Sequence, residues 1–168
     1  EARRLASGRA FQSQPRFSPD GNQVVFISDE SGSENIWIMD ASGAHPRQIT
    51  KLTHPFLMTP EWSADGKRIY VTQVDSQGMR GGGLNKGEAE LWEYDMATGN
   101  GRRIVANAAG PSPFLVSACA PGPYVSQVSD DGNSLLYTFV RPRAYGVRQG
   151  ASSHVVRYQL NTQTEERL

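Results

Sequence analysis

The pattern Ser-x-Asp-Gly occurs three times in this chain, each time directly after an aromatic or branched residue and just before a hydrophobic run. The copies read Phe17-Ser18-Pro19-Asp20-Gly21, Trp62-Ser63-Ala64-Asp65-Gly66 and Val128-Ser129-Asp130-Asp131-Gly132. Ser and Asp side chains hydrogen-bond back to the main chain and Gly adopts a positive φ at little cost, so each copy predicts a tight turn between two strands. A unit that recurs in this way predicts stacked repeats, which constrains the fold more than any other feature.

Each turn is followed by the same succession of short hydrophobic segments, which we interpret as strands. The second strands are expected at 24–26, 69–71 and 135–137, the third at 36–40, 91–95 and 155–159, and the fourth at 47–49, 102–104 and 166–168. The segment Arg3-Arg4-Leu5 is a further copy of the fourth strand, with no first three strands ahead of it. Segments 75–88, 106–123 and 141–152 are interpreted as insertions, and long loops of this kind are candidates for specific contacts.

The repeat predicts an all-β fold: part of a β-propeller, with about three four-stranded blades plus an orphan fourth strand. We expect residues 1–12 to be the last strand of a preceding blade and a linker. Residues 13–50 and 56–105 are expected to form two blades, and residues 111–168 a degraded blade with insertions. Propeller rings usually have about four to eight blades. The chain is therefore expected to be part of a larger propeller, or to complete a ring with a second copy.

A single four-stranded sheet cannot bury both of its faces, so neighbouring blades are expected to stack face to face. The large hydrophobic residues on the expected strands are candidates for this packing between blades. They are Phe17, Trp62, Val25, Tyr70, Leu136, Trp37 and Trp92.

The composition excludes several classes of partner. The chain has 17 basic and 17 acidic residues, so its charge does not indicate binding to nucleic acid or to an anionic membrane. No apolar run approaches the length of a membrane span. The single cysteine, Cys119, rules out a disulfide within the chain but leaves the compartment open.

The first repeat resembles the TolB-type propeller repeat, also called the PD repeat. The resemblance lies in three segments: Pro15 to Gly21, Asn35 to Gly43, and Pro46 to Thr50. It is strong over residues 13–50, good over 58–105, and degraded over 124–168, where Ser126 replaces the leading Pro and Gln159 replaces the Asp that ends the third strand.

Propellers of this family occur in three settings, and the resemblance leaves all three open. They form TolB itself, a periplasmic protein-binding component without enzyme activity. They precede the catalytic domain of prolyl-oligopeptidase-like serine peptidases, and they precede metal-dependent amidohydrolase domains in periplasmic or secreted bacterial enzymes. The run from Ser7 to Gly21 and the Gly81-Gly82-Gly83 loop look most like the amidohydrolase-associated version.

The resemblance therefore implies a non-catalytic scaffold or recognition module of a periplasmic or secreted protein. The expected partners are the remaining blades or a catalytic domain of the parent protein, or a second copy of the chain. A protein or peptide ligand is also an expected partner.

We expect no catalytic residue, no cofactor site and no metal site in this chain. Its histidines, His45, His54 and His154, form neither a His-x-His pair nor a His-Glu-x-x-His helix. No Gly-x-Ser-x-Gly nucleophile motif occurs, and Cys119 has no histidine near it in the sequence.

Two further clusters could bind a ligand, although a solvated loop explains each of them better. Arg141, Arg143, Tyr145 and Arg148 form a candidate partner-binding loop for an acidic partner or a carboxylate. Asp29, Glu30 and Glu34 form an acidic turn, but they do not meet the full pattern of a calcium loop.

Overall fold

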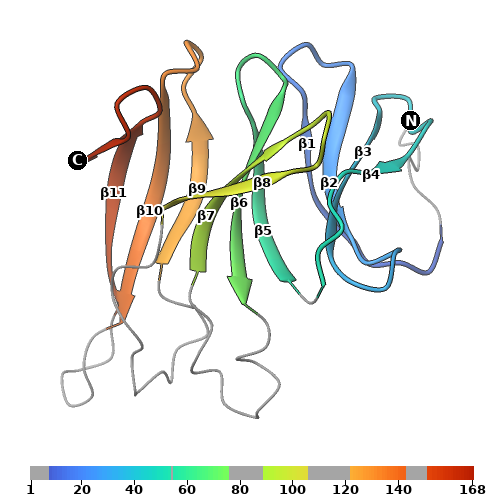
Figure 1. The fold of residues 1–168 in the computed structure, drawn as a ribbon, viewed down its shortest axis with the longest axis horizontal. Helices are drawn as coiled ribbons and strands as arrows, with labels where there is room; N and C mark the ends of the chain where they lie inside the picture. Colours follow the sequence, from blue (N-terminus) through green and yellow to red (C-terminus); the bar gives the residue numbers. More distant parts are fainter. Residues whose placement is uncertain (1–7, 54, 76–88, 106–121, 143–150) are drawn as a thin grey trace, which may run out of the picture.

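The chain folds into twelve β-strands that form three separate four-stranded antiparallel sheets. The computed structural model describes residues 8–53, 55–75, 89–105, 122–142 and 151–168, and no helix occurs among these residues. Figure 1 shows the three sheets side by side, with the first and the third at opposite ends of the row. This arrangement confirms the predicted all-β fold and its three blades.

Each sheet is built from four consecutive strands in sequence order. The first sheet contains β1 (Gln12–Phe17), β2 (Gln23–Ser28), β3 (Asn35–Asp40) and β4 (Arg47–Gln48). The second contains β5 (Pro55–Trp62), β6 (Arg68–Asp75), β7 (Ala89–Asp95) and β8 (Gly101–Val105). The third contains β9 (Gly122–Val128), β10 (Ser134–Pro142), β11 (Ala151–Gln159) and β12 (Thr164–Arg167).

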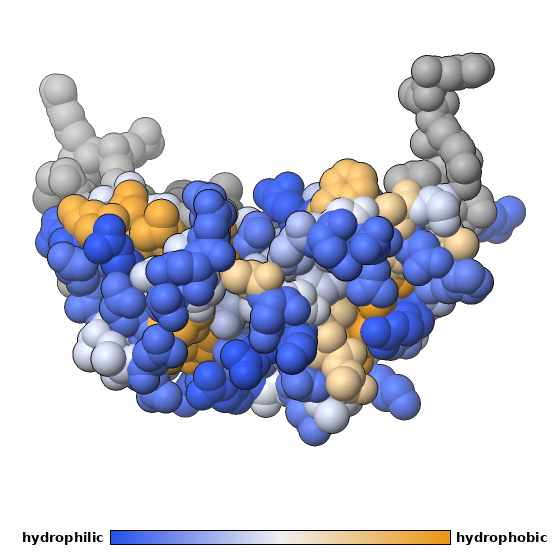
Figure 2. Space-filling view, turned by 90° about the horizontal axis from the view of Figure 1, so that it is seen from above, coloured by the Kyte–Doolittle hydropathy of each residue, from blue (hydrophilic) through white to orange (hydrophobic). Residues whose placement is uncertain are grey.

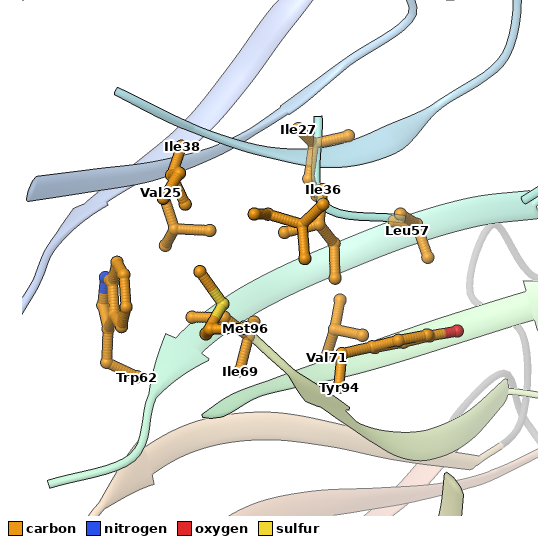
Figure 3. Packing of buried hydrophobic residues seen from close by; sticks show 11 residues of the cluster. Val25, Ile27, Ile36, Ile38, Leu57, Trp62, Ile69, Val71, Tyr94 and Met96 are labelled. Carbon is orange, nitrogen blue, oxygen red and sulfur yellow. The ribbon is translucent and has the colours of Figure 1, made fainter. Parts of the chain in front are cut away.

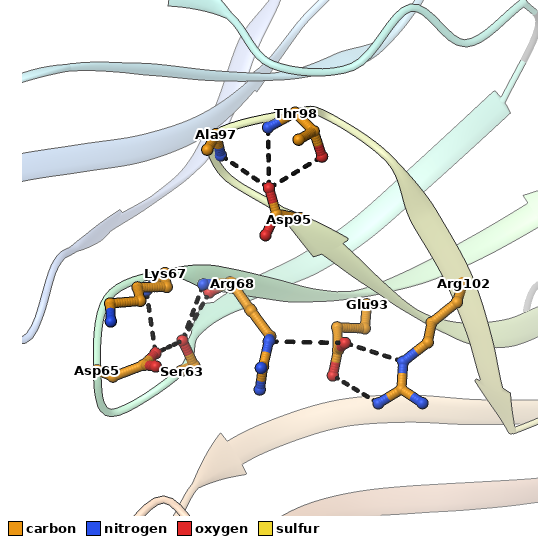
Figure 4. A network of polar contacts seen from close by, with 9 residues as sticks. All are labelled: Ser63, Asp65, Lys67, Arg68, Glu93, Asp95, Ala97, Thr98 and Arg102. Carbon is orange, nitrogen blue, oxygen red and sulfur yellow. Dashed lines mark hydrogen bonds and ion pairs between the residues drawn. The ribbon is translucent and has the colours of Figure 1, made fainter.

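The Ser-x-Asp-Gly pattern forms the same hydrogen-bonded turn in all three sheets. In the second sheet, the Ser63 hydroxyl donates to Asp65 Oδ1 at 2.6 Å and accepts from the Arg68 main-chain N–H at 2.9 Å (Figure 4). Asp65 Oδ1 also accepts from the Lys67 N–H at 3.0 Å, and Gly66 has a φ of +68°. The turn therefore satisfies its own polar groups, which confirms the predicted capping role of the three turn aspartates.

Hydrophobic residues on both faces of the second sheet join the three sheets into one body. Each sheet has a leading face, which points toward the previous sheet in the chain, and a trailing face, which points toward the next one. Cross-strand pairing places four trailing-face residues of the first sheet together: Val25 opposite Ile38, and Ile27 opposite Ile36. All four are at most 1% exposed, because they pack on the leading face of the second sheet (Figure 3).

The leading face of the second sheet supplies the aromatic side of that core. Ile69 pairs with Tyr94 and with Trp62, and Val71 pairs with Trp92. The same positions of the third sheet form its leading face, which packs on the second sheet in a second core. These residues are Val128, Leu135, Tyr137, Val156 and Tyr158.

Several predicted details are corrected by the structure. The three expected insertions are shorter than predicted because the strands continue into them: Asp75 pairs with Pro55, Gly122 with Val140, and Arg141 with Ser152. The expected orphan strand at Arg3-Arg4-Leu5 lies outside the described residues, as does most of each insertion.

The prediction of packing between blades is confirmed for four residues and stays a prediction for three. Val25, Trp62 and Tyr70 are buried between sheets, and Trp92 packs partly buried against the first core. Phe17 and Trp37 lie on the leading face of the first sheet, and Leu136 lies on the trailing face of the third. Each of these two faces has no neighbouring sheet among the described residues.

Candidate interaction surface

The leading face of the first sheet carries an exposed hydrophobic residue at a position where the other two sheets bury one. Phe17 pairs with Val24, as Trp62 pairs with Ile69 and Val128 with Leu135, so the three occupy one repeat position. Trp62 is 3% exposed and Val128 is 8% exposed, but Phe17 is 64% exposed. The covered copies show that this position is built for burial.

A groove of about 300 Å³ lies on the first sheet and is lined by residues of β1, β2 and β3. Its lining is mostly apolar and consists of Gln12, Ser13, Pro15, Arg16, Phe17, Val24, Phe26 and Met39. Figure 2 shows hydrophobic residues at the surface near both ends of the row of sheets. The corresponding face of the second sheet packs against the trailing face of the first sheet, so a neighbouring sheet can cover a face of this kind.

Polar contacts set how one sheet sits on the next. The Trp62 indole N–H donates to the Arg16 carbonyl oxygen at 3.1 Å, and the Leu57 N–H donates to Glu34 Oε2 at 2.9 Å. Glu34 thus joins two sheets, although the sequence favoured a solvated hairpin for it. Burial raises the pKa of Glu34, because a carboxylate loses its hydration there.

The second interface contains a largely buried charge cluster. Glu93, on the trailing face of the second sheet, accepts from Arg102 at 2.9 and 3.2 Å and lies 3.8 Å from Arg68 (Figure 4). The Glu93 side chain is only 10% exposed. Its hydrogen bond raises the pKa of Arg102, and burial raises the pKa of the neighbouring Tyr70 to about 12.

The trailing face of the third sheet forms the other free end of the row. Leu136 pairs with Arg157, and Thr138 pairs with Val155, which is 46% exposed. Arg157 forms an ion pair with Glu166 at 3.4 Å. This face is therefore mixed in character, whereas the leading face of the first sheet is mainly hydrophobic.

The candidate partner-binding loop lies almost entirely outside the described residues. Arg143, Tyr145 and Arg148 belong to the segment that is not described, and Arg141 is described only as part of the backbone of β10. The loop remains a prediction.

Among the described residues, the histidines do not come together. His45 contacts Asp40 Oδ2 at 2.6 Å in an exposed turn, and His154 lies on β11 opposite Phe139, while His54 is not described. No group of three or more His, Cys, Asp or Glu side chains that could hold a metal occurs in the part of the chain that the structure describes. The same part contains no helix long and apolar enough to cross a membrane.

Sequence reasoning missed that the two ends of the row carry the free surface. The signal was available, because aligning Phe17 with Trp62 and Val128 shows which residues share a repeat position. The alignment of the repeats does not show which of the three residues is covered by another sheet, since that depends on the order in which the sheets stack.

Comparisons with known proteins support the fold. No protein-family model matches the chain. The chain is 33% identical over 87 residues to the uncharacterized peptidase YuxL of Bacillus subtilis, a match that covers 51% of this chain and 13% of that protein. It is 34% identical over 84 residues to a TolB homolog of Chlorobium chlorochromatii, covering 50% of this chain and 17% of that protein. The chain thus spans less than a fifth of either relative.

A solved structure extends the likeness to nearly the whole chain. The crystal structure of TolB from Acinetobacter baumannii matches 98% of this chain and 33% of its own, with a TM-score of 0.66 and 21% identity. Identity at that level is evidence of fold only. The chain therefore has the fold of one part of a TolB-like β-propeller.

Proposed function

We propose that this chain is a non-catalytic scaffold and recognition segment of a larger bacterial protein exported to the periplasm or beyond. The exposure of Phe17 is the observation that carries this proposal, since its counterparts Trp62 and Val128 are buried under a neighbouring sheet. A repeat position that is designed for burial but left open indicates further blades beyond the three described here.

We further propose that the parent protein is a metal-dependent amidohydrolase whose catalytic domain lies outside this chain. The support is the resemblance of the run from Ser7 to Gly21, and of the Gly81-Gly82-Gly83 loop, to amidohydrolase-associated propellers. In such a protein the propeller would limit access to the catalytic domain or orient substrate toward it.

Two other parents each have a specific observation in their favour. The match to the peptidase YuxL favours a serine peptidase that carries a propeller. The match to a TolB homolog favours a protein-binding propeller without enzyme activity, whose ligand would be a protein or peptide. Both parents share the proposed role of this segment and differ only in what lies outside it.

Three measurements on the longer protein separate these parents. The metal content is measured by mass spectrometry, hydrolysis of a panel of small amides and esters is followed with and without 1,10-phenanthroline, and reactive serines are labelled with a fluorophosphonate. An amidohydrolase would contain bound metal and lose its activity to the chelator. Labelling by the fluorophosphonate would instead identify a serine peptidase, and a protein that neither hydrolyses nor becomes labelled would be a binding protein.

The 168-residue chain alone serves as the control for the non-catalytic role. We expect it to hydrolyse none of the panel with or without added zinc. Metal-dependent hydrolysis by the chain alone would contradict the proposal.

A further inference from the structure

The outer strand of the second sheet, β8, begins at Gly101, directly after Asn100, and this is the only Asn-Gly pair in the sequence. The main-chain nitrogen that follows an asparagine can attack the carbon of the side-chain amide. Glycine allows the closest approach, because it has no Cβ and few restrictions on its backbone. In a folded protein the reaction therefore depends on whether hydrogen bonds hold the asparagine amide and the next N–H in place.

The side-chain amide of Asn100 differs from those of the other described asparagines. Asn22 and Asn133 each donate from Nδ2 to the aspartate of their own Ser-x-Asp-Gly turn at 3.0 Å. Asn35 and Asn161 also donate from Nδ2, in each case to an oxygen atom at 3.1 Å. Asn100 is exposed, and its side chain forms no hydrogen bond with any described residue. Its amide is therefore free to turn toward the next residue.

The N–H of Gly101 lies outside the hydrogen-bonded ladder of the sheet. The Asn100 carbonyl oxygen accepts from the Asp95 N–H at 2.9 Å, so this carbonyl points toward β7. The peptide bond between Asn100 and Gly101 is trans, and the Gly101 N–H therefore points away from β7. β8 is the last strand of its sheet among the described residues, and Gly101 is exposed. The attacking nitrogen thus lies at an open edge of the sheet.

The packing of the sheet requires glycine at this reactive position. Gly101 lies opposite Tyr94 on β7, and a Cβ on Gly101 would come within 2.3 Å of the ring atom Cε1 of Tyr94. The Tyr94 ring cannot easily move aside, because it is buried in the first core and its hydroxyl donates to Gln73 at 2.6 Å. The fold therefore keeps the residue that makes Asn100 reactive.

We propose that Asn100 is a site of spontaneous deamidation in the folded chain. The Gly101 nitrogen loses its proton to water or hydroxide and forms a bond to Asn100 Cγ, while the bond from Cγ to Nδ2 breaks and ammonia leaves. Water then opens the five-membered imide at either of its two carbonyl carbons, which gives aspartate or isoaspartate. The sum converts asparagine and water into an acidic residue and ammonia, with no change of oxidation state.

The isoaspartyl product changes the start of β8. Its main chain runs through the former side chain and gains an extra carbon atom ahead of Gly101, and the oxygen that accepts from Asp95 becomes part of a free carboxylate. β8 has only five residues, and its Arg102 donates to Glu93 at 2.9 and 3.2 Å (Figure 4). A shift of Arg102 weakens the pairing of Glu93, which is largely buried at the second interface, and destabilises the folded chain.

Peptide mass spectrometry of the 168-residue chain tests the reaction. Trypsin releases residues 87–102 as one peptide, in which Asn100 carries the only side-chain amide. After incubation at neutral pH and physiological temperature, we expect this peptide to gain the mass difference between an amide and a carboxylic acid. The tryptic peptide 17–47, which contains Asn22 and Asn35, should remain unchanged and serves as the control.

The same incubation in urea provides the unfolded reference. We expect the folded chain to deamidate at Asn100 no more than severalfold more slowly than the unfolded chain, because neither reacting group is held. A folded chain whose peptide 87–102 stays unmodified while the unfolded chain reacts would overturn the proposal, since the fold would then protect Asn100.

A second measurement tests the effect on β8. Ion-exchange chromatography separates the deamidated chain by its additional negative charge, and methyl transfer by an isoaspartyl methyltransferase quantifies its isoaspartate. We expect this fraction to unfold at a lower urea concentration than freshly purified Asn100→Asp, which has the same charge and an ordinary main chain. Equal midpoints would overturn the proposed displacement of β8. Both measurements are independent of which parent protein carries this segment.

Discussion

Replacing Phe17 and Trp62 by alanine should have very different effects on stability, although both residues occupy the same repeat position. Trp62 is 3% exposed and its indole N–H donates to Arg16. Truncating a buried Trp to Ala usually removes about 3–5 kcal/mol, so we expect Trp62→Ala to lower the free energy of unfolding by about 4 kcal/mol.

Phe17 keeps most of its surface in water, so its loss should be small. It is 64% exposed, and complete burial of such a side chain contributes about 1.5–3 kcal/mol. Burial of roughly a third of it corresponds to about 0.5–1 kcal/mol, and the two variants should therefore differ by about 3 kcal/mol.

Urea unfolding of the 168-residue chain, followed by circular dichroism at 25 °C, measures both values. If Trp62→Ala does not fold, Trp62→Phe provides a milder change that removes the hydrogen bond to Arg16 and should cost about 1 kcal/mol or more. Equal losses for Phe17→Ala and Trp62→Ala would refute the reasoning, because they would mean that the leading face of the first sheet is already covered. In the longer protein we expect the effect of Phe17→Ala to rise toward that of Trp62→Ala.

Three further changes test the turns that define each sheet. Ser63→Ala leaves the Arg68 N–H without its hydroxyl acceptor, and since Ser63 is buried we expect a loss of about 1–2 kcal/mol in urea unfolding. Gly99→Ala should destabilise the chain by about 1–3 kcal/mol more than Gly66→Ala. Both glycines have a positive φ, but a Cβ at Gly99 would overlap the Ile49 carbonyl oxygen, whereas a Cβ at Gly66 would meet no atom. Equal melting temperatures for these two variants would contradict that explanation. Hydrogen bonds from Ser129 and Asn133 lower the pKa of Asp131 from 3.8 to about 2, so the folded state gains stability from its charge above pH 4 and loses it as the pH falls toward 2. The difference in melting temperature between the unchanged chain and Asp131→Asn should accordingly shrink between pH 4 and pH 2, and a constant difference would show that the charge of Asp131 is not involved.

The sequence was sufficient for the fold because every unit carries its own local signals. The Ser-x-Asp-Gly turn forms its hydrogen bonds within six residues, so its structure does not depend on distant parts of the chain. The alternation of residues along each strand then decides which side chains share a face. Strand ends were less predictable, since Arg141 and Ser152 continue the β10–β11 ladder into a segment that reads as a loop.

The candidate surface was less predictable because exposure depends on neighbours that lie far away in the sequence. Phe17 and Trp62 have the same local pattern, and only the stacking order makes one exposed and the other buried. Glu34 likewise reads as a solvated acid in the sequence, yet it accepts a hydrogen bond from Leu57 on the next sheet. Such contacts between sheets depend on tertiary geometry, which the repeat pattern does not specify.

The four branched aliphatic residues on the trailing face of the first sheet have a consequence for synthesis on the ribosome. Val25, Ile27, Ile36 and Ile38 emerge before the sheet that covers them, whose strands run from Pro55 to Val105. At about 5–20 residues per second, roughly fifty residues take about 3–10 s to be synthesised. During that time the nascent chain exposes a hydrophobic patch to which other proteins can bind. The mixed trailing faces of the second and third sheets present a less adhesive surface to chaperones and to other nascent chains at the corresponding stages.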